Sequence, residues 1–303
     1  MGMQSPESNG NRPVNIEGQL PDAGGQVTAL DGLTAYINAG GRGVRLSSIF
    51  HPHERRGVSK ALLPIGQPPI SLIEHQINKL DHAGVPTIVA GVGNHENVAE
   101  YMQSLYVGRN NIHAVHYENQ LGNGGDLVRT VRDYPELFAE NVLITCVDVL
   151  LDVDEADFFA FHQDTGGDLL IALTLNMGVP NEGAYYVDSE GRVIYCGEVN
   201  QNCISEDEAA VSHSYRGSST GALIANKDTL RELEWQPEDG PLSLYGEVVA
   251  TALGRGSMFA FNNGGRLFTD VGTVDSWSSV QANSDMITPY IHYANLQERK
   301  VAS

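Results

Sequence analysis

The sequence predicts an α/β fold, in which a mostly parallel mixed sheet is covered by helices. Three observations support this prediction. Short apolar segments alternate with segments whose apolar residues have helical spacing. The first apolar segment ends in a glycine-rich loop, as in Rossmann-like folds. After residue 175 the pattern changes to short strands separated by polar loops, which predicts a small mixed β-region over the carboxyl edge of the sheet.

The expected elements follow one another along the chain. Strands are expected where short apolar runs occur, at residues 34–38, 87–91, 112–117, 141–147 and 168–175. Helical spacing of apolar residues predicts helices at residues 70–82, 96–105, 127–134 and 155–163. The small β-region is expected to contain strands at residues 185–187, 193–195 and 221–225. A helical segment at residues 276–301 is expected to close the chain.

Composition divides the chain into an extension and one domain. Residues 1–33 are polar and rich in glycine, proline and asparagine, so we expect a flexible N-terminal extension followed by a single domain at residues 34–303. With 18 basic and 38 acidic residues, the net charge is -20, which argues against binding to nucleic acid or to an anionic membrane.

Compartment is predicted from three further features. No apolar stretch reaches membrane-spanning length, and the first residues lack the pattern of a signal peptide. The three cysteines are odd in number and lack metal or redox spacing, as expected for reduced thiols. These features predict a cytoplasmic protein.

The glycine-rich loop after the first strand is the most informative motif. Bare glycine backbone allows phosphate oxygens to approach closely. Within this acidic protein, residues 42–60 carry five basic groups and one acidic group, a local charge of +4. Leu46 replaces the third glycine of a dinucleotide fingerprint, and Ser59-Lys60 has the reverse order of a Walker loop. The loop therefore predicts a phosphate site outside those two motif classes.

An ordered series of motifs resembles the sugar-1-phosphate nucleotidylyltransferases, including hexose- and heptose-1-phosphate guanylyltransferases. The family opens with Gly-Gly-x-Gly-Thr-Arg-Leu, followed by Pro-Lys and Leu-x-Pro. The corresponding residues here are Gly40-Gly41-Arg42-Gly43-Val44-Arg45-Leu46, Ser59-Lys60 and Leu63-Pro64. Later motifs are Gln120-Leu-Gly-Asn-Gly-Gly125, Val142-Leu-Ile-Thr-Cys-Val-Asp148, Ser219-Thr-Gly221 and Asp270-Val-Gly-Thr273.

The resemblance implies a fold of the nucleotide-diphospho-sugar transferase type and a specific reaction. A nucleotidyl group would pass from an NTP to a sugar 1-phosphate, giving an NDP-sugar and pyrophosphate. The catalytic residues would be Arg45, Lys60 and Asp148, and Asp148 and Asp270 would bind Mg²⁺. The resemblance assigns nucleotide binding to Asn38, Ala39, Gly40, Gly41, Gly43, Leu121, Gly122, Gly124 and Gly125. It favours GTP slightly as donor and implies that the chain can form homo-oligomers.

The sugar-phosphate half of the predicted site departs from the family. The resemblance assigns this half to Gly183, Glu198, Arg216 and Thr220. Val199 stands where the family has a phosphate-binding lysine, and no lysine lies nearby in the sequence. We therefore expect an arginine to replace that cation, with Arg216 preferred over Arg192.

Two other functions are consistent with the sequence. Asp152-Val-Asp154 has the Asp-x-Asp form that binds metal and NDP-sugar in glycosyltransferases. The missing lysine also allows a non-catalytic relative that senses nucleotides. Asp148 has an alternative interpretation as a helix cap, because aspartate is favoured at that position. His51 and His53 are interpreted as surface residues, because no cysteine or third metal ligand lies close to them in the sequence.

Overall fold

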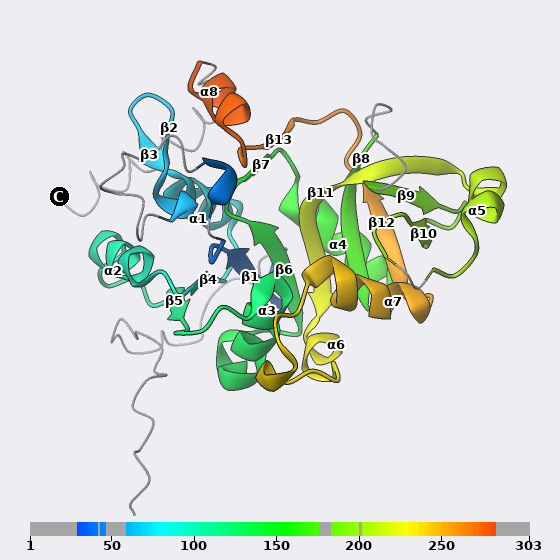
Figure 1. Cartoon of the computed structure of the whole chain (residues 1–303), viewed down its shortest axis with the longest axis horizontal. Coiled ribbons are helices and arrows are strands. Elements are labelled where there is room, and N and C mark those ends of the chain that lie inside the picture. Colours follow the sequence, from blue (N-terminus) through cyan, green and yellow to red (C-terminus); the bar gives the residue numbers. More distant parts are fainter. Residues whose placement is uncertain (1–28, 42, 47–58, 176–182, 200–201, 283–303) are drawn as a thin grey trace, which may run out of the picture.

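The computed structural model describes residues 29–41, 43–46, 59–175, 183–199 and 202–282 (Figure 1). Most of the expected extension, the segment with His51 and His53, and the last part of the expected closing helix lie outside these residues. Two residues of the expected extension, Leu30 and Leu33, are buried in the core. The ordered fold therefore begins before residue 34.

Four parallel strands form the first half of the central sheet. They are β1 (Leu33–Asn38), β4 (Thr87–Gly93), β5 (Ile112–His116) and β6 (Asn141–Cys146), in the order β6-β1-β4-β5. Every pair in this half is parallel. The sequence predicted all four strands to within two residues at each end. Because they are parallel, their carboxyl ends lie at one edge, where ligands bind in open α/β sheets.

The second half of the sheet is mixed. The long strand β11 (Tyr215–Asn226) is antiparallel to both β6 and β8 (Leu169–Thr174), and β12 (Met258–Asn262) is parallel to β8. The first half of β11 also pairs with β9 (Ala184–Val187), which pairs with β10 (Val193–Cys196). Figure 1 shows β9 and β10 at the end of the sheet far from β5.

One sequence prediction in this half was wrong in extent. Residues 221–225 are the end of a 12-residue strand rather than a short strand, because the polar run Tyr215-Arg-Gly-Ser-Ser-Thr220 concealed its first half. The strands β12 and β13 (Phe268–Asp270) were not predicted. The remaining short strands are β2 (Pro64–Ile65), β3 (Ile70–Ser71) and β7 (Val149–Leu151).

Helices cover both faces of the sheet. Helices α1 (Leu72–Ala83), α2 (Glu96–Leu105) and α4 (Glu155–Thr165) pack on one face, and α3 (Gly122–Asp133), α6 (Lys227–Arg231) and α7 (Ala250–Gly254) pack on the other. Strand β1 is buried from both sides: Ala35 and Ile37 join the first apolar cluster, and Tyr36 joins the second. This arrangement confirms the predicted fold class.

Helix α3 begins five residues before its predicted start. Its first turn contains the glycines of the Gly122–Gly125 motif, and glycine's low helix propensity caused the error. Helix α1 agrees with its prediction and has a capping box in which Ser71 and Glu74 bond each other's backbone N–H. The other helices are α5 (Glu206–Ser212), α8 (Val274–Ala282), a π-helix (Leu244–Val249), and 3₁₀ turns at Val44–Leu46, Lys60–Leu62, Pro135–Leu137 and Pro237–Asp239.

Candidate functional site

A lysine and an aspartate form the centre of the candidate site. Lys60 opens a 3₁₀ turn, and Asp148 lies between β6 and β7, at the carboxyl edge of the parallel strands. Lys60 Nζ lies 2.5 Å from Asp148 Oδ2, and both side chains are largely buried. Asp148 is not a helix cap, because the next helix, α4, begins at Glu155 and is capped by Asp154. The helix-cap interpretation of Asp148 is therefore wrong.

The two predicted metal ligands are brought together by a two-stranded ladder. Strand β13 is antiparallel to β7, and the Val271 N–H donates to the Asp148 carbonyl at 2.7 Å. Asp270, the last residue of β13, therefore lies beside Asp148. Its Oδ1 accepts the Gly272 N–H at 2.6 Å, and the residue is exposed to solvent.

Arg45 joins this group because Gly272 has no side chain. A Cβ built on Gly272 would lie 2.7 Å from an Arg45 terminal nitrogen and 2.6 Å from Asp270 Oδ1. Both charged groups thus occupy the space in front of this glycine. Arg45, Lys60, Asp148 and Asp270 form one cluster of two cations and two carboxylates.

The glycine loop packs closely against its neighbours. A Cβ on Gly41 would lie 2.9 Å from Lys60 Cε, and one on Gly43, whose φ is 58°, would lie 3.0 Å from Lys60 Cβ. A Cβ on Gly40 would lie 3.0 Å from the Gly93 Cα, at the end of β4. These glycines therefore allow the lysine and the strand to approach the loop, besides leaving its backbone bare.

A cavity of about 420 Å³ lies in front of this loop. Of the predicted nucleotide-binding residues, Asn38, Gly40, Gly41 and Gly122 line it, together with Lys60 and Asp148. Ala39, Gly43, Leu121, Gly124 and Gly125 do not. Gln120, Asn123, Asp126, Cys146 and Pro241 also line it, and sequence reasoning assigned no role to the last four.

The Gly122–Gly125 motif serves packing more than ligand approach. The N–H groups of Gly124 and Gly125 both donate to the Leu242 carbonyl, at 3.0 and 3.2 Å. A Cβ on Gly122 would lie 2.5 Å from the same oxygen. The segment before the π-helix therefore crosses the N-terminus of α3. The predicted contact of Gly124 and Gly125 with a nucleotide is not supported by these positions.

Burial changes the pKa of two cavity residues. Burial, together with the Asp148 carboxylate, raises the pKa of the Cys146 thiol to about 12, so this thiol is neutral at physiological pH. Burial also raises the pKa of Asp126 to about 6, against the lowering effects of the Leu121 N–H and Arg129. Asp126 stands just after the glycines of a recognised motif, which is the only sequence signal that pointed toward it.

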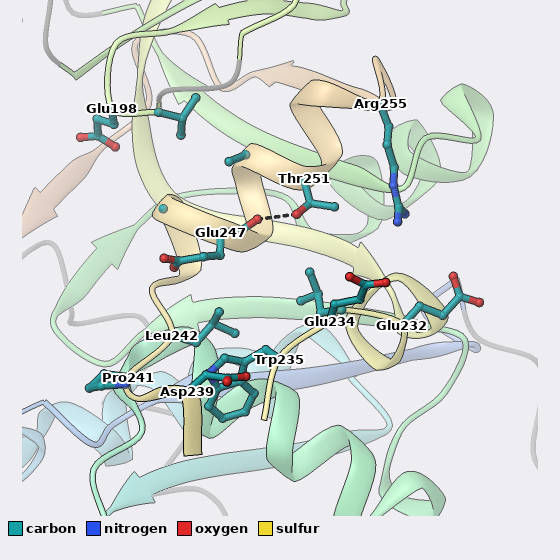
Figure 2. A pocket seen from close by; sticks show the side chains of 14 residues that line it. Glu198, Glu232, Glu234, Trp235, Asp239, Pro241, Leu242, Glu247, Thr251 and Arg255 are labelled. Atoms are coloured by element: carbon teal, nitrogen blue, oxygen red, sulfur yellow. Dashed lines mark hydrogen bonds between the residues drawn. The ribbon is translucent and has the colours of Figure 1, made fainter. Parts of the chain in front are cut away.

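A second, larger cleft lies beside the first and shares Pro241 with it. Its volume is about 910 Å³. Figure 2 shows Glu198 and Glu247 on one side of this cleft and Arg255 on the other. Glu232, Glu234 and Asp239 also line it, so its charge is strongly negative. Burial raises the pKa of Glu198.

The predicted sugar-phosphate residues do not converge. Arg216 pairs with Tyr186 across the β9–β11 ladder and lies 5.5 Å from the centre of that ring. Tyr185, on the opposite face of β9, has its pKa raised by burial, with smaller contributions from Cys196, Tyr245 and Glu198. Arg216 therefore projects from the face of this ladder that carries Tyr186, opposite Tyr185, and it does not line the cleft that contains Glu198.

The other members of the predicted set also lie apart. Thr220 is fully buried, and its hydroxyl donates to the Ala172 carbonyl at 2.9 Å. Gly183 stands immediately before β9, and Val199 packs in the core. The side chain of Arg192 lies over Phe259 of β12. The structure thus does not place a replacement cation at Arg216 or Arg192.

The Asp-x-Asp pair has a structural explanation. Asp154 Oδ1 accepts the N–H groups of Ala156 and Asp157, both at 3.0 Å, which caps α4. Within the described part of the chain, no group of three or more His, Cys, Asp or Glu side chains is arranged to hold a metal ion. The same residues include no helix with the length and apolar character needed to cross a bilayer.

The sheet order and the position of the site define a fold of the nucleotide-diphospho-sugar transferase type. HddC from Yersinia pseudotuberculosis shares this fold with a TM-score of 0.61 and 17% identity, over 82% of this chain and 98% of HddC. HddC complexed with GMP-PN gives a TM-score of 0.62 at 17% identity, with the same coverage.

A third solved structure is similar to the same extent. It is a Bacillus anthracis protein assigned as a glucose-1-phosphate thymidylyltransferase, in complex with a sucrose, with a TM-score of 0.62 and 16% identity. The similarity covers 83% of this chain and 95% of that protein. At these identities it establishes the fold. No protein-family model and no curated protein sequence matches the chain.

Proposed function

We propose that this protein transfers a nucleotidyl group from an NTP to a sugar 1-phosphate, releasing pyrophosphate. The observation that carries the proposal is the cluster of Arg45, Lys60, Asp148 and Asp270 at the carboxyl edge of the parallel strands, beside a glycine loop. The shared fold with an assigned thymidylyltransferase supports the same reaction class.

The donor set fits Mg²⁺. Mg²⁺ in nucleotide sites is usually held by one or two carboxylates, with phosphate oxygens and water completing an octahedron. Asp148 stands just before β7, Asp270 ends the adjacent strand β13, and Asp270 is exposed. These two residues would hold the ion, which when bound would neutralise charge that develops on the α-phosphate.

The residues of the chain would act mainly by positioning and charge. Lys60 has only Asp148 as its ion-pair partner among the described residues, and a bound triphosphate would offer it a second anionic partner. Arg45 would hold the leaving β- and γ-phosphates, and Lys60 would bridge the α-phosphate and the acceptor phosphate. The sugar phosphate oxygen would attack the α-phosphorus in line as pyrophosphate leaves, so no covalent enzyme intermediate is needed.

The donor and acceptor would occupy different cavities. The cavity of about 420 Å³ would hold the NTP, and the sequence form of the Gln120–Gly125 motif favours GTP. The complex of HddC with GMP-PN supports a guanine nucleotide. The adjoining cleft with Glu198 would hold the sugar, and Glu198 would bind its hydroxyls. Lys60 would then supply the positive charge for the acceptor phosphate.

The two alternatives are less well supported. A glycosyltransferase would need Asp152 and Asp154 to bind metal, but Asp154 already caps α4. A non-catalytic nucleotide sensor is favoured only by the absence of a lysine at position 199.

The test is a panel of GTP, ATP, CTP, UTP and dTTP against several hexose and heptose 1-phosphates, with pyrophosphate release as the readout. We expect release that requires both substrates and Mg²⁺. Nucleotide binding without turnover across a broad panel would contradict the enzymatic proposal and favour the sensor. Release of free NDP from NDP-sugars with an acceptor would favour the glycosyltransferase.

A further inference from the structure

Asp126 is a buried carboxylate that the proposed chemistry does not use. It lies in the second turn of α3 and lines the cavity of about 420 Å³. Asp126 is only 5% exposed to solvent. Among the described residues, Asp126 Oδ1 has no hydrogen-bond partner. A buried carboxylate oxygen without a partner is costly, so such a group is expected to serve a ligand.

The surroundings of Asp126 compensate its charge only in part, because burial outweighs the Leu121 N–H and Arg129. Asp126 Oδ2 lies 3.1 Å from the point that a Gly40 Cβ would occupy and 3.5 Å from that of Gly93. The carboxylate therefore faces the bare backbone at the ends of β1 and β4. The nearby Arg129 is already engaged, because its Nε donates to Asp133 at 3.1 Å and its guanidinium lies over the Tyr117 ring.

The other polar groups at this end of the cavity are already bonded within the protein. Asn38 Nδ2 donates to the Asn123 carbonyl at 3.1 Å. Asn123 Oδ1 accepts the Leu244 N–H at 2.9 Å. Asp126 is thus the strongest acceptor left for a ligand on this wall. Lys60, a cation that lines this cavity, pairs with Asp148 and not with Asp126. Because an uncompensated carboxylate repels phosphate, we assign the wall that contains Asp126 to the nucleoside and not to the triphosphate.

Base chemistry identifies the matching donor. Guanine carries two adjacent N–H donors on its Watson–Crick edge, N1–H and N2–H, which match the two oxygens of a carboxylate. Uracil and thymine have one N–H between two carbonyl acceptors. Adenine and cytosine place an amino group beside an acceptor nitrogen. We propose that Asp126 selects the donor nucleotide by accepting hydrogen bonds from guanine N1–H and N2–H. This inference rests on the proposed role of the cavity as the NTP site.

The test measures nucleotide binding by calorimetry in the presence of Mg²⁺ and without acceptor, so it does not depend on turnover. Wild type should bind GTP at least about tenfold more tightly than ITP, which lacks the N2 amine, because a hydrogen bond to a charged group is lost. Asp126→Asn should weaken GTP binding by a similar factor. It should also strengthen XTP binding, because the new amide N–H can donate to O2 of xanthine.

Controls separate the base from the rest of the molecule. Glu136→Gln changes an exposed carboxylate just after the same helix, leaves the Arg129–Asp133 bond intact, and should leave the order of GTP, ITP and XTP unchanged. The 2′- and 3′-deoxy forms of GTP test whether Asp126 binds ribose instead. Equal binding of GTP and ITP by wild type would overturn the inference, as would equal loss of all nucleotides in Asp126→Asn or a preference that follows the ribose hydroxyls. Failure of wild type to bind any NTP would overturn the proposed function itself.

Discussion

The predicted site residues lie in contact with one another in one half of the sheet and lie apart in the other half. In the parallel half, Lys60, Asp148 and the glycine loop lie in direct contact. In the mixed half, Arg216 lies over Tyr186, Glu198 lines the adjoining cleft and Thr220 is buried in the core. The proposed binding of the nucleotide is therefore supported by side chains in contact, whereas the proposed binding of the acceptor is supported mainly by a cleft lined by Glu198.

The cause of this difference is the direction of the strands. Residues that directly follow parallel strands meet at one edge, whatever the details of register. The mixed-half residues instead lie within β11 or beside β9, where successive side chains point to opposite faces. The register with β8 also shifts between Ser219 and Leu223. Motif order alone therefore locates residues in the first half but not in the second.

The largest expected effect tests the metal ligand in the parallel half. Asp148→Asn removes a carboxylate charge at nearly constant shape, so Mg²⁺-dependent pyrophosphate release should fall by about 10³-fold. Asp152→Asn is the matched control, because Asp152 is exposed and belongs to the alternative Asp-x-Asp pair. Its activity should stay within about twofold of wild type. Loss in the Asp152 variant with normal activity in the Asp148 variant would reverse the assignment of function.

The stability of Asp126→Asn tests whether the buried Asp126 carboxylate, in the parallel half, destabilises the folded protein. Burial raises the pKa of this carboxyl from 3.8 to about 6, so the folded state favours the protonated form. Burying the ionised carboxylate lowers the free energy of unfolding, and this loss of stability is absent below pH 3.8, grows as the pH rises and is complete above pH 6. The variant should therefore be more stable than wild type by about 2–3 kcal/mol at pH 8. That gain should shrink toward pH 4 in urea unfolding, and a gain independent of pH would contradict a buried ionised carboxylate.

Gly124→Ala tests the packing role of the motif at the start of α3. Alanine normally favours a helix over glycine, but a Cβ here would lie 2.8 Å from the backbone of residues 243 and 244. We expect a loss of about 1–3 kcal/mol in the free energy of unfolding. Gly265→Ala is the control, because no atom lies within 4 Å of its Cβ position. A stabilised Gly124 variant would show that the segment before the π-helix can move away.

The smallest expected effect concerns Arg216. Because its guanidinium lies over Tyr186, Arg216→Ala should change the KM for the sugar phosphate by less than about twofold. Glu198→Gln is the comparison in the same kinetic assay, and it should raise that KM more, because Glu198 lines the cleft. A tenfold rise in KM for the Arg216 variant alone would restore the sequence-based assignment of Arg216 to the sugar-phosphate site. Motif order would then locate site residues in both halves of the sheet.

Much of the fold was predictable because apolar periodicity marks buried strands and helices. The strands β1, β4, β5 and β6 were found for that reason. The first half of β11 was missed because its polar side chains pair at the side of the sheet next to β9. The start of α3 was missed because tertiary contacts with Leu242 overcome the low helix propensity of its glycines.

The site was predictable where a motif residue follows a parallel strand. Asp148 follows β6 and meets Lys60, which lies in a 3₁₀ turn. Asp270 joins them through β13, a strand that the sequence did not predict. Asp126 could not be assigned a role, because its importance depends on burial and on the absence of a partner for Oδ1. Neither property is visible in a linear pattern.

The most direct test of the nucleotide cluster is the affinity for MgGTP of wild type and Lys60→Gln, measured by calorimetry without acceptor. Lys227→Gln serves as a control lysine outside the cavity. Wild type and the control should bind one GTP per chain with equal affinity, and Lys60→Gln should bind at least about tenfold more weakly, because a charge-assisted phosphate contact is lost. Equal affinity in all three proteins would contradict the assignment of this cavity to the triphosphate.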